Sequence, residues 1–317
     1  MFGFAKSQVH AIGVDLSGDG LRLAQLVHNG QQLGLVAGCW RACPADVGPG
    51  TATWQRWAAD AIHRMVTEAG FRGKVVAAAM FPADVSIETF RMPKAAEGRL
   101  EDALFAKAKQ QMSLRYSREN ALIRYVPTDQ DNALVMVAER DLIDRQLAIY
   151  EAAGLTLKSM GAWPEALATC YARFFGRRQS DLQAVVMLVN IETSCTQVVI
   201  CRHTQLLFAR SIPVGAGRLD DEKAFNGLVL EVTACRRDFA SMYRNAPLTR
   251  VIFLSGPSVQ TGVYATLAKQ LEVQAQIGDC MAAVEGTDPA ASPPHGRDPD
   301  RRACPVSWAT AFGLSLS

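Results

Sequence analysis

Residues 11–38 read AIGVDLSGDGLRLAQLVHNGQQLGLVAG, and residues 186–214 read VMLVNIETSCTQVVICRHTQLLFARSIPV. Each stretch contains three apolar-rich strand candidates joined by tight polar turns, so the chain carries one three-strand unit twice. Asp15 and Asn190 occupy the same place in the two copies. A repeat with this separation predicts two similar α/β domains that face each other across a cleft.

The composition is that of an ordinary globular protein. The chain has 317 residues, of which 49% are hydrophobic and 20% are charged, and this length accommodates two domains of typical size. The formal net charge is +2 and the paired arginines are short and isolated, so we expect no nucleic-acid partner. Because no run of about 18 apolar residues is present, we predict no membrane-spanning helix.

The eight cysteines and five histidines show no metal-ligand spacing. There is no CxxC motif, and Cys195, Cys201 and Cys235 fall within apolar strand or helix patterns. A free cysteine in such a pattern packs as a small apolar side chain. We therefore expect no metal site, free thiols and a reducing cytoplasm.

Between the two repeats the sequence pattern changes. The first repeat is followed by a predicted helix at 53–69 and a predicted buried strand at 74–80. Residues 82–161 then read β-α-β-β-α-β, which is typical of a compact two-layer unit and indicates an insertion. Its strands are predicted at 85–91, 121–126, 133–138 and 155–159, and its helices at 97–112 and 140–153.

The remaining segments complete the second domain. A predicted helix at 164–175 leads into the second repeat, and the helix predicted at 220–243 carries a continuous apolar stripe, which indicates a core face. Residues 285–304 are rich in proline and charge, which predicts a mobile loop. The other predicted elements are a strand at 250–255 and helices at 263–271 and 307–316.

These patterns predict an α/β chain in three parts. Residues 1–82, completed by about 161–180, are assigned to the first domain, and 83–160 to a small inserted α+β subdomain. Residues 181–317 are assigned to the second domain, with the mobile loop near 285–304.

The two turns expected at the cleft have the chemistry of a nucleotide site. Backbone N–H groups that converge in a hairpin turn form an anion-binding nest, and two such turns that face each other hold a polyphosphate. A carboxylate at each strand end would hold hydrated Mg²⁺, which prefers oxygen ligands. In this chain only the first copy retains that carboxylate, at Asp15.

Four segments resemble the PilM family, the actin-like cytoplasmic components of type IV pilus machines. GVDLSGDGLRLAQL at 13–26 resembles the family's opening GLDIGSSSVKLVEL, and LVLEVTACRRDFASMY at 228–243 resembles LILEIQRSLDFY. VNIETSCTQVVICRHTQLLFARSIPVGAGRL at 189–219 resembles VDIGASTTDLSIFRDGQLLFSRSIPIGG, and SWATAFGLSL at 307–316 resembles YATAIGLAL. The resemblance covers nearly the whole chain. It implies an actin-like ATPase fold, in which two duplicated ribonuclease-H-like α/β domains carry a small inserted α+β subdomain.

The chain departs from the family's pattern at the phosphates. Asn190 replaces the second carboxylate, and Glu192 stands where the family has a glycine, which brings a negative charge near a phosphate. Gln197 falls where a small polar or acidic residue is usual, and Pro257 replaces a glycine of the adenosine turn and removes an N–H donor. We therefore expect a degenerate nucleotide site, no enzymatic activity and no cofactor, with ATP and magnesium as the alternative.

The resemblance also gives candidate cofactor-binding residues for this degenerate cleft. They are Asp15, Ser17, Gly18, Thr193, Ser194, Gly256 and Ser258. No catalytic residue and no metal ligand are predicted. The alternative to a metal role for Asp15 is a strand-end carboxylate that caps neighbouring amides.

The function implied by the resemblance is that of a cytoplasmic scaffold at the inner face of the inner membrane. PilM proteins bind the short N-terminal tail of a bitopic PilN-type protein, and so couple the pilus assembly ATPase to the periplasmic parts of the machine. The groove for this tail is bordered by the first domain and the insertion, and we expect it around 82–100 and 124–138. Membrane association is then peripheral, through partners.

Other functions stay open. The machine served is a type IV pilus or a related MSHA-like, competence or secretion system. The first alternative function is an ATP-binding or ATP-hydrolysing actin-like enzyme. The second is an FtsA-like, filament-forming division protein, whose family carries a membrane-binding helix after a linker, which we do not expect here.

Overall fold

The first five-stranded sheet contains the first sequence repeat. The computed structural model describes residues 8–30, 32–94, 98–285 and 304–317. The strand order is β3-β2-β1-β4-β8, in which β1 to β3 are antiparallel and β4 and β8 run parallel to β1. The bounds are β1 (Gln8–Ser17), β2 (Gly20–Asn29), β3 (Gln32–Ala42), β4 (Val75–Ala79) and β8 (Thr156–Gly161).

The second sheet repeats this arrangement strand for strand. Its order is β11-β10-β9-β12-β13, with β9 to β11 antiparallel and β12 and β13 parallel to β9. The predicted duplication is therefore confirmed. The bounds are β9 (Val185–Ile191), β10 (Thr196–Arg202), β11 (Gln205–Ile212), β12 (Leu248–Phe253) and β13 (Gln274–Ile277).

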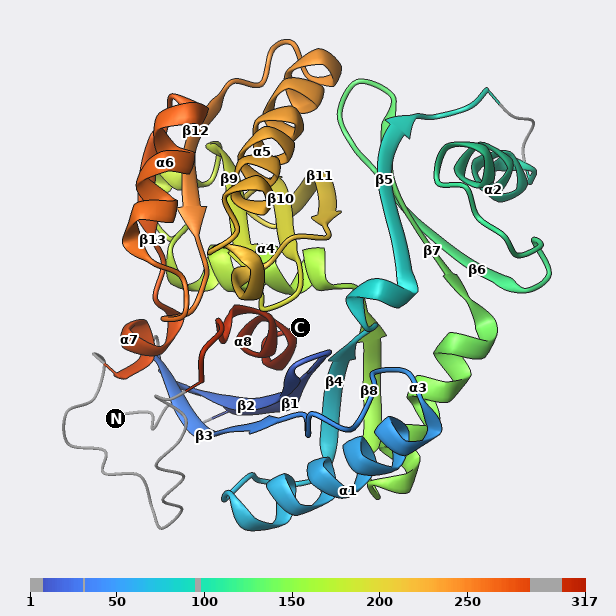
Figure 1. The fold of residues 1–317 in the computed structure, drawn as a ribbon, viewed down its shortest axis with the longest axis vertical. Helices are drawn as coiled ribbons and strands as arrows, with labels where there is room; N and C mark the ends of the chain where they lie inside the picture. The colour runs from blue at the N-terminus through green and yellow to red at the C-terminus, as the bar shows by residue number, and fades with distance from the viewer. Residues whose placement is uncertain (1–7, 31, 95–97, 286–303) are drawn as a thin grey trace, which may run out of the picture.

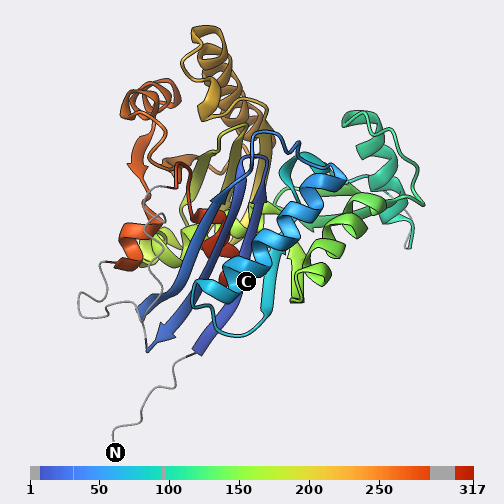
Figure 2. The same cartoon turned by 60° about the horizontal axis from the view of Figure 1, so that its bottom comes forward.

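A smaller antiparallel sheet, in the order β5-β7-β6, forms the insert. Helix α2 (Leu100–Gln111) covers one face of it with Leu104, Phe105 and Ala108. The predicted start of this helix at residue 97 lies outside the described residues. The insert stands to one side of the molecule in Figures 1 and 2, and β5 lies beside β11. Its strands are β5 (Val85–Arg91), β6 (Ala121–Pro127) and β7 (Asn132–Glu139).

The place of β8 differs from the prediction. The sequence pattern placed a strand at 155–159 in the inserted unit, whereas β8 pairs with β4 at the edge of the first sheet. The helix before it, α3 (Arg140–Ala152), also packs Ile149 and Tyr150 into the core of the first sheet. The duplication gives the reason, because β8 takes the place in the first sheet that β13 takes in the second.

The helices form layers around the two large sheets (Figure 1). The first domain is the first sheet with α1 and α3, and the second domain is the second sheet with α5 and α6, which supply the buried side chains of their cores. Helices α4 and α8 lie between the sheets and pack on both. The bounds are α1 (Ala52–Glu68), α4 (Trp163–Phe174), α5 (Glu222–Met242), α6 (Thr261–Leu271) and α8 (Ala309–Ser315).

Some parts of the chain were harder to predict. The sequence does not predict β13 or α7 (Cys280–Glu285), and β13 reads QAQI with all four residues exposed, so that no apolar alternation marks it. Single-turn 3₁₀ helices lie at Pro82–Asp84, Gln179–Asp181 and Ala216–Arg218. All eight cysteines are free, as predicted. The mobile loop predicted near 285–304 lies outside the described residues except at its ends.

Two glycines allow α8 to touch the backbone on either side of it. A Cβ on Gly13 of β1 would lie 2.0 Å from the carbonyl oxygen of Ala311, and a Cβ on Gly313 would lie 1.9 Å from that of Ala166 in α4. Ser315 Oγ donates to Ala11 O at 2.8 Å. Helix α8 therefore joins the first sheet to α4 through close backbone contact.

Candidate functional site

In the first repeat, a tight turn brings an acidic and a basic side chain together. Ser17 pairs with Gly20 across the turn, and this register places Asp15 directly opposite Arg22. Nε and Nη2 of Arg22 lie 2.9 and 2.8 Å from Oδ2 of Asp15. The carboxylate for which a metal role and an amide cap were the two alternatives is therefore engaged by a guanidinium.

The second repeat places uncharged side chains at the equivalent positions. Asn190 on β9 lies opposite Gln197 on β10, as Asp15 lies opposite Arg22. Asn190 Nδ2 donates to Oε1 of Gln197 at 3.0 Å and to Oε1 of Glu192 at 2.7 Å. An amide pair in one domain thus corresponds to an ion pair in the other.

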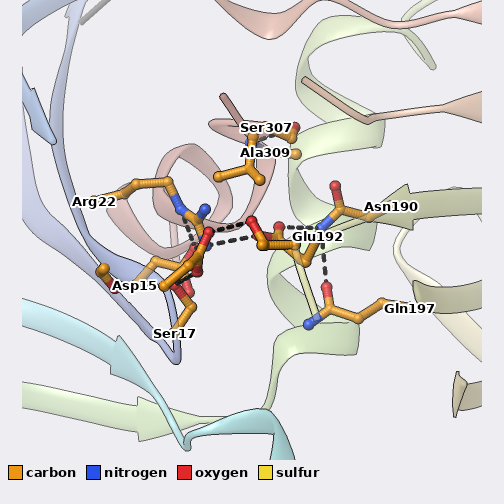
Figure 3. A network of polar contacts seen from close by, with 12 residues as sticks. Asp15, Ser17, Arg22, Asn190, Glu192, Gln197, Ser307 and Ala309 are labelled. Atoms are coloured by element: carbon orange, nitrogen blue, oxygen red, sulfur yellow. Dashed lines mark hydrogen bonds and ion pairs between the residues drawn. The ribbon is translucent and has the colours of Figure 1, made fainter. Parts of the chain in front are cut away.

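Arg22 also reaches across the cleft. Its Nη2 lies 2.9 Å from Oε2 of Glu192, which follows β9, and the contact is an ion pair without the alignment of a hydrogen bond. Arg22 is 1% exposed, and Asp15 and Glu192 are buried as well. Figure 3 shows the guanidinium beside carboxylates that come from both sides of the cleft. One cation of the first domain therefore joins an anion of each domain.

Burial controls the protonation of this cluster. Loss of water raises the pKa of Glu192 to about 7, although Arg22 acts to lower it. Burial likewise raises the pKa of Asp15, and the ion pair with Arg22 offsets only part of that rise. Burial acts to lower the pKa of Arg22, but the two carboxylates raise it above its ordinary value. Arg22 therefore stays charged, while Glu192 exchanges its proton near neutral pH.

A second contact joins the two turns beside the cluster. Asp19 accepts a hydrogen bond from Thr193 Oγ1 at its Oδ2 and one from Ser17 Oγ at its Oδ1, both at 2.5 Å. Burial acts to raise the pKa of Asp19, but Arg22 and the two hydroxyls outweigh burial and bring its pKa below the ordinary value. An ionised Asp19 thus ties the turn after β1 to the turn after β9.

The predicted cofactor-binding residues fall into two places. Asp15, Ser17, Gly18 and Ser194 line one cavity of about 260 Å³, which Arg22 lines as well. Thr193 binds Asp19 next to this cavity. Gly256 instead lines a different cavity, of about 500 Å³.

The turn predicted to hold adenosine is in contact with the chain's own backbone. A Cβ on Gly256 would lie 2.3 Å from the carbonyl carbon of Val306. The backbone N–H of Ser258 donates to Pro305 O at 2.9 Å. The segment that follows residue 303 therefore occupies the face of the turn that carries Gly256 and Ser258.

The side chains of the cleft do not fit a magnesium-bound nucleotide. Arg22 holds the carboxylate of Asp15, and Glu192 brings a second carboxylate into the turn expected to bind phosphate. Among the described residues, no three His, Cys, Asp or Glu side chains are arranged to hold a metal ion. A phosphate here would meet buried acidic groups whose counter-ion is already paired.

Sequence reasoning did not single out Arg22 or Asp19. A signal was present, because Arg22 is the only Lys, Arg, Asp or Glu in β2 and a two-residue turn at 18–19 fixes it opposite Asp15. The contact of Arg22 with Glu192 joins two domains. The spacing of residues within one segment of the sequence does not predict such a contact.

A second candidate site, the insert groove, lies between the insert and the first sheet. It holds a cavity of about 80 Å³ whose lining includes the apolar side chains of Met80, Val85, Leu122, Met136, Ile143 and Met160. Val85, Arg124, Met136 and Ala138 line it and fall within the predicted ranges 82–100 and 124–138.

Two strand edges border the insert groove. Strand β6 is an edge of the insert sheet and β8 is an edge of the first sheet. Arg124 on β6 forms a two-pronged ion pair with Glu165 on α4, with N–O distances of 2.8 and 3.2 Å. An apolar floor between two strand edges is the kind of surface that receives an extended peptide.

Comparison with known families identifies the chain. The profile of the family described as type IV pilus assembly protein PilM matches residues 13–231. The chain belongs to the PilM family. A structure described as a PilM–PilN type IV pilus biogenesis complex is similar to this PilM-family chain with a TM-score of 0.71 and 19% identity, over 97% of this chain and 98% of that one. The predicted actin-like ATPase fold is confirmed by this similarity.

Two further structures are similar to this PilM-family chain at lower scores. A Bacteroides thetaiotaomicron protein with an actin-like ATPase fold and unknown function has a TM-score of 0.49 and 11% identity, over 91% of this chain and 100% of that one. The cytoplasmic domain of EpsL, an inner-membrane component of the Vibrio cholerae type II secretion system, has a TM-score of 0.46 and 16% identity, over 78% and 82%. No curated protein matches the chain. None of the described helices combines the length and hydropathy that a membrane span requires.

Proposed function

We propose that this PilM-family chain is a cytoplasmic scaffold of a type IV pilus or related machine. In this proposal it binds the N-terminal tail of a PilN-type bitopic inner-membrane protein in the insert groove. The observation that carries the proposal is the apolar floor of that groove between the edges of β6 and β8. A similar structure of the same family is a complex with PilN, which supports the choice of partner.

The groove offers a tail three kinds of contact. The edges of β6 and β8 present backbone groups to which an extended segment can add as a further strand. Met80, Met136 and Met160 line the floor, and methionine side chains adapt to apolar groups of varied shape. The ion pair of Arg124 is partly exposed and contributes little in water, so that charged groups of a tail exchange with it at small cost.

The proposed location follows from the proposed partner. A bitopic protein is anchored in the inner membrane, so the chain that holds its tail lies at the cytoplasmic face of that membrane. The pilus assembly ATPase is a further proposed partner.

We also propose that the chain is not an ATPase. The ion pairs of Arg22 with Asp15 and Glu192 support this, because they place buried charge where a nucleotide and its metal would lie. Saturable binding of a fluorescent ATP analogue, lost in the Asp15→Ala variant, would instead favour the actin-like enzyme.

Two exposed leucines provide a matched test of the groove. Leu122 lies in the groove and is 49% exposed, whereas Leu230 lies on α5 and is 72% exposed. We expect Leu122→Asp to weaken binding of a fluorescent peptide of the cognate tail by about tenfold or more, which corresponds to about 1.4 kcal/mol. Leu230→Asp should bind as the wild type does. The measurement is fluorescence anisotropy without nucleotide.

Two results would count against this proposal. One is a wild-type chain that does not bind the cognate tail. The other is an equal loss of affinity in Leu122→Asp and Leu230→Asp, which would show that the groove is not the site.

A further inference from the structure

The buried cluster around Arg22 carries a large desolvation cost, which offsets the stability that its ion pairs give to the fold. Arg22, Asp15 and Glu192 are all removed from water, and Nη1 of Arg22 has no hydrogen-bond partner among the described residues. A buried ion pair is often no more stabilising than apolar side chains of the same volume, because desolvation offsets the attraction. This cluster joins the two domains, because Asp15 belongs to the first sheet and Glu192 follows a strand of the second sheet.

The other side of the domain interface is apolar and tightly packed. Helices α4 and α8 share one core with Ala24 and Leu26 of the first sheet and with Val186 and Leu188 of the second. Close backbone contacts at Gly13 and Gly313 leave no room for α8 to slide. This packed side would act as a pivot, and the cleft, which Arg22 bridges, would be the side that opens.

The insert is attached to the second domain as well as to the first. Arg202 of β10 forms an ion pair at 2.9 Å with Asp129, which lies between β6 and β7. The hydroxyl groups of Tyr243 and Thr128 are 2.6 Å apart. Because β5 also lies beside β11, the insert would follow the second domain when the cleft opens.

The walls of the insert groove therefore belong to parts that would move separately when the cleft opens. Leu122 and Met136 come from the insert sheet, whereas Met160 and Gly161 come from β8 of the first sheet. An opening of the cleft changes the distance between these walls. The width of the groove is thus coupled to the contacts of Arg22.

We propose that Arg22 is a positioning residue, which closes the cleft in place of a bound nucleotide and so holds the insert groove at the width that receives the partner tail. The inference rests on the proposed function, because the tail is the ligand whose affinity reports the groove. The bridge is part of the chain, so tail binding does not depend on ATP.

The first test measures the affinity of the tail peptide in variants that do not touch the groove. Arg22→Met keeps an unbranched apolar stem but removes the charged guanidinium group. We expect about tenfold weaker binding, because the closed state would become a minor population. Arg22→Lys should restore most of the affinity. Arg237→Met, at an exposed arginine of α5, should bind as the wild type does. Addition of ATP and magnesium to the wild type should change nothing.

The second test needs no tail. Hydrogen exchange should become faster in β6 and β8 of Arg22→Met, while α4 and α8 stay protected. If Arg22→Met does not fold, Arg22→Gln places at this position the residue type that Gln197 supplies at the equivalent position of the second repeat, and is expected to act in the same direction.

The two proposals fail in different ways. A folded Arg22→Met variant with wild-type tail affinity and unchanged exchange in β6 and β8 overturns the inference, and so does an ATP-dependent tail affinity. A wild-type chain that does not bind the tail overturns the proposed function. Faster exchange in the variant would still support the coupling in that case.

Discussion

Glu192 is a buried carboxyl group whose charge changes close to neutral pH. Burial raises its pKa to about 7, whereas burial raises the pKa of the thiols of Cys195 and Cys304 to about 12 and about 11 and keeps them neutral. The charged and titratable groups that face Glu192 are Arg22, Asp15, Asp19, Cys195 and Cys304. A change between pH 5 and 8 therefore changes the charge of Glu192.

The first prediction concerns stability and pH. Glu192 titrates near its ordinary value of 4.5 when unfolded and at about 7 when folded, so the folded chain binds more protons between these values. This group therefore lowers stability as pH rises from about 5 to 7. As pH falls from 8 to 5, we expect the wild type to gain on the order of 2–3 kcal/mol relative to Glu192→Gln in urea unfolding.

Glu231→Gln serves as the control, because Glu231 is exposed on α5. A stability difference between the wild type and Glu192→Gln that stays constant from pH 5 to 8 would contradict the prediction.

Single residues of the cleft were predictable only where a motif marked them. Asp15 and Ser17 stand in the turn of the first repeat and do line the cavity. Gly256 and Ser258 were assigned by the same resemblance, but they contact the backbone of Val306 and Pro305. That segment lies about fifty residues further along the chain, and no local pattern connects it to the turn.

At the level of elements, α8 depends on the absence of one side chain. A Cβ on Gly313 would lie 1.9 Å from Ala166 O, and this neighbour is backbone and cannot rotate away. We expect Gly313→Ala to lower the free energy of unfolding by about 2 kcal/mol or more, because α8 must move off α4. Gly227→Ala in α5, where nothing lies within 4 Å, should be neutral or slightly stabilising.

Thermal or urea unfolding of the two variants checks this comparison. Equal stability of Gly313→Ala and the wild type would mean that α4 and α8 are not in close contact.

Elements with a clear apolar pattern were predicted well, whereas β13 was missed and β8 was assigned to the wrong sheet. The helix expected at 220–243 is α5, whose Leu228, Val232, Cys235 and Phe239 are buried as the stripe required. Strand β13 has no buried residue. The exposed and half-buried residues of β8 do not alternate regularly, so they do not indicate which strand β8 pairs with. Pairing of parallel strands is decided by the packing of whole domains, so local sequence did not show that β8 belongs with β4.

At the scale of the whole molecule, the contacts in the cleft predict that added nucleotide does not change the stability of the chain. A ligand that binds only the folded chain at a concentration of about 100 times its Kd adds about 2.7 kcal/mol to stability, which raises the Tm by several degrees. We expect no shift of the Tm with millimolar ATP and magnesium in differential scanning fluorimetry. A rise in the wild type that is absent in Asp15→Ala would refute this.

The architecture as a whole followed from the repeat. Two copies of a three-strand unit, with a different pattern between them, were sufficient to predict two facing domains and an insertion. The positions of the parts relative to one another were not predictable, because they depend on contacts such as that of Arg22 with Glu192, which join residues far apart in the chain.

The packing of α8 also sets an order of events during synthesis. Leu26 N donates to Ser315 Oγ, and this hydroxyl donates to Ala11 O, across sequence separations of 289 and 304 residues. During synthesis β1 and β2 therefore wait for α8, whose Ser315 follows their contact residues by 289 and 304 positions, before their inner face is covered. Until then the apolar surfaces of β1 and α4 are open to other chains, so a nascent or prematurely ended chain is the form most in need of a chaperone.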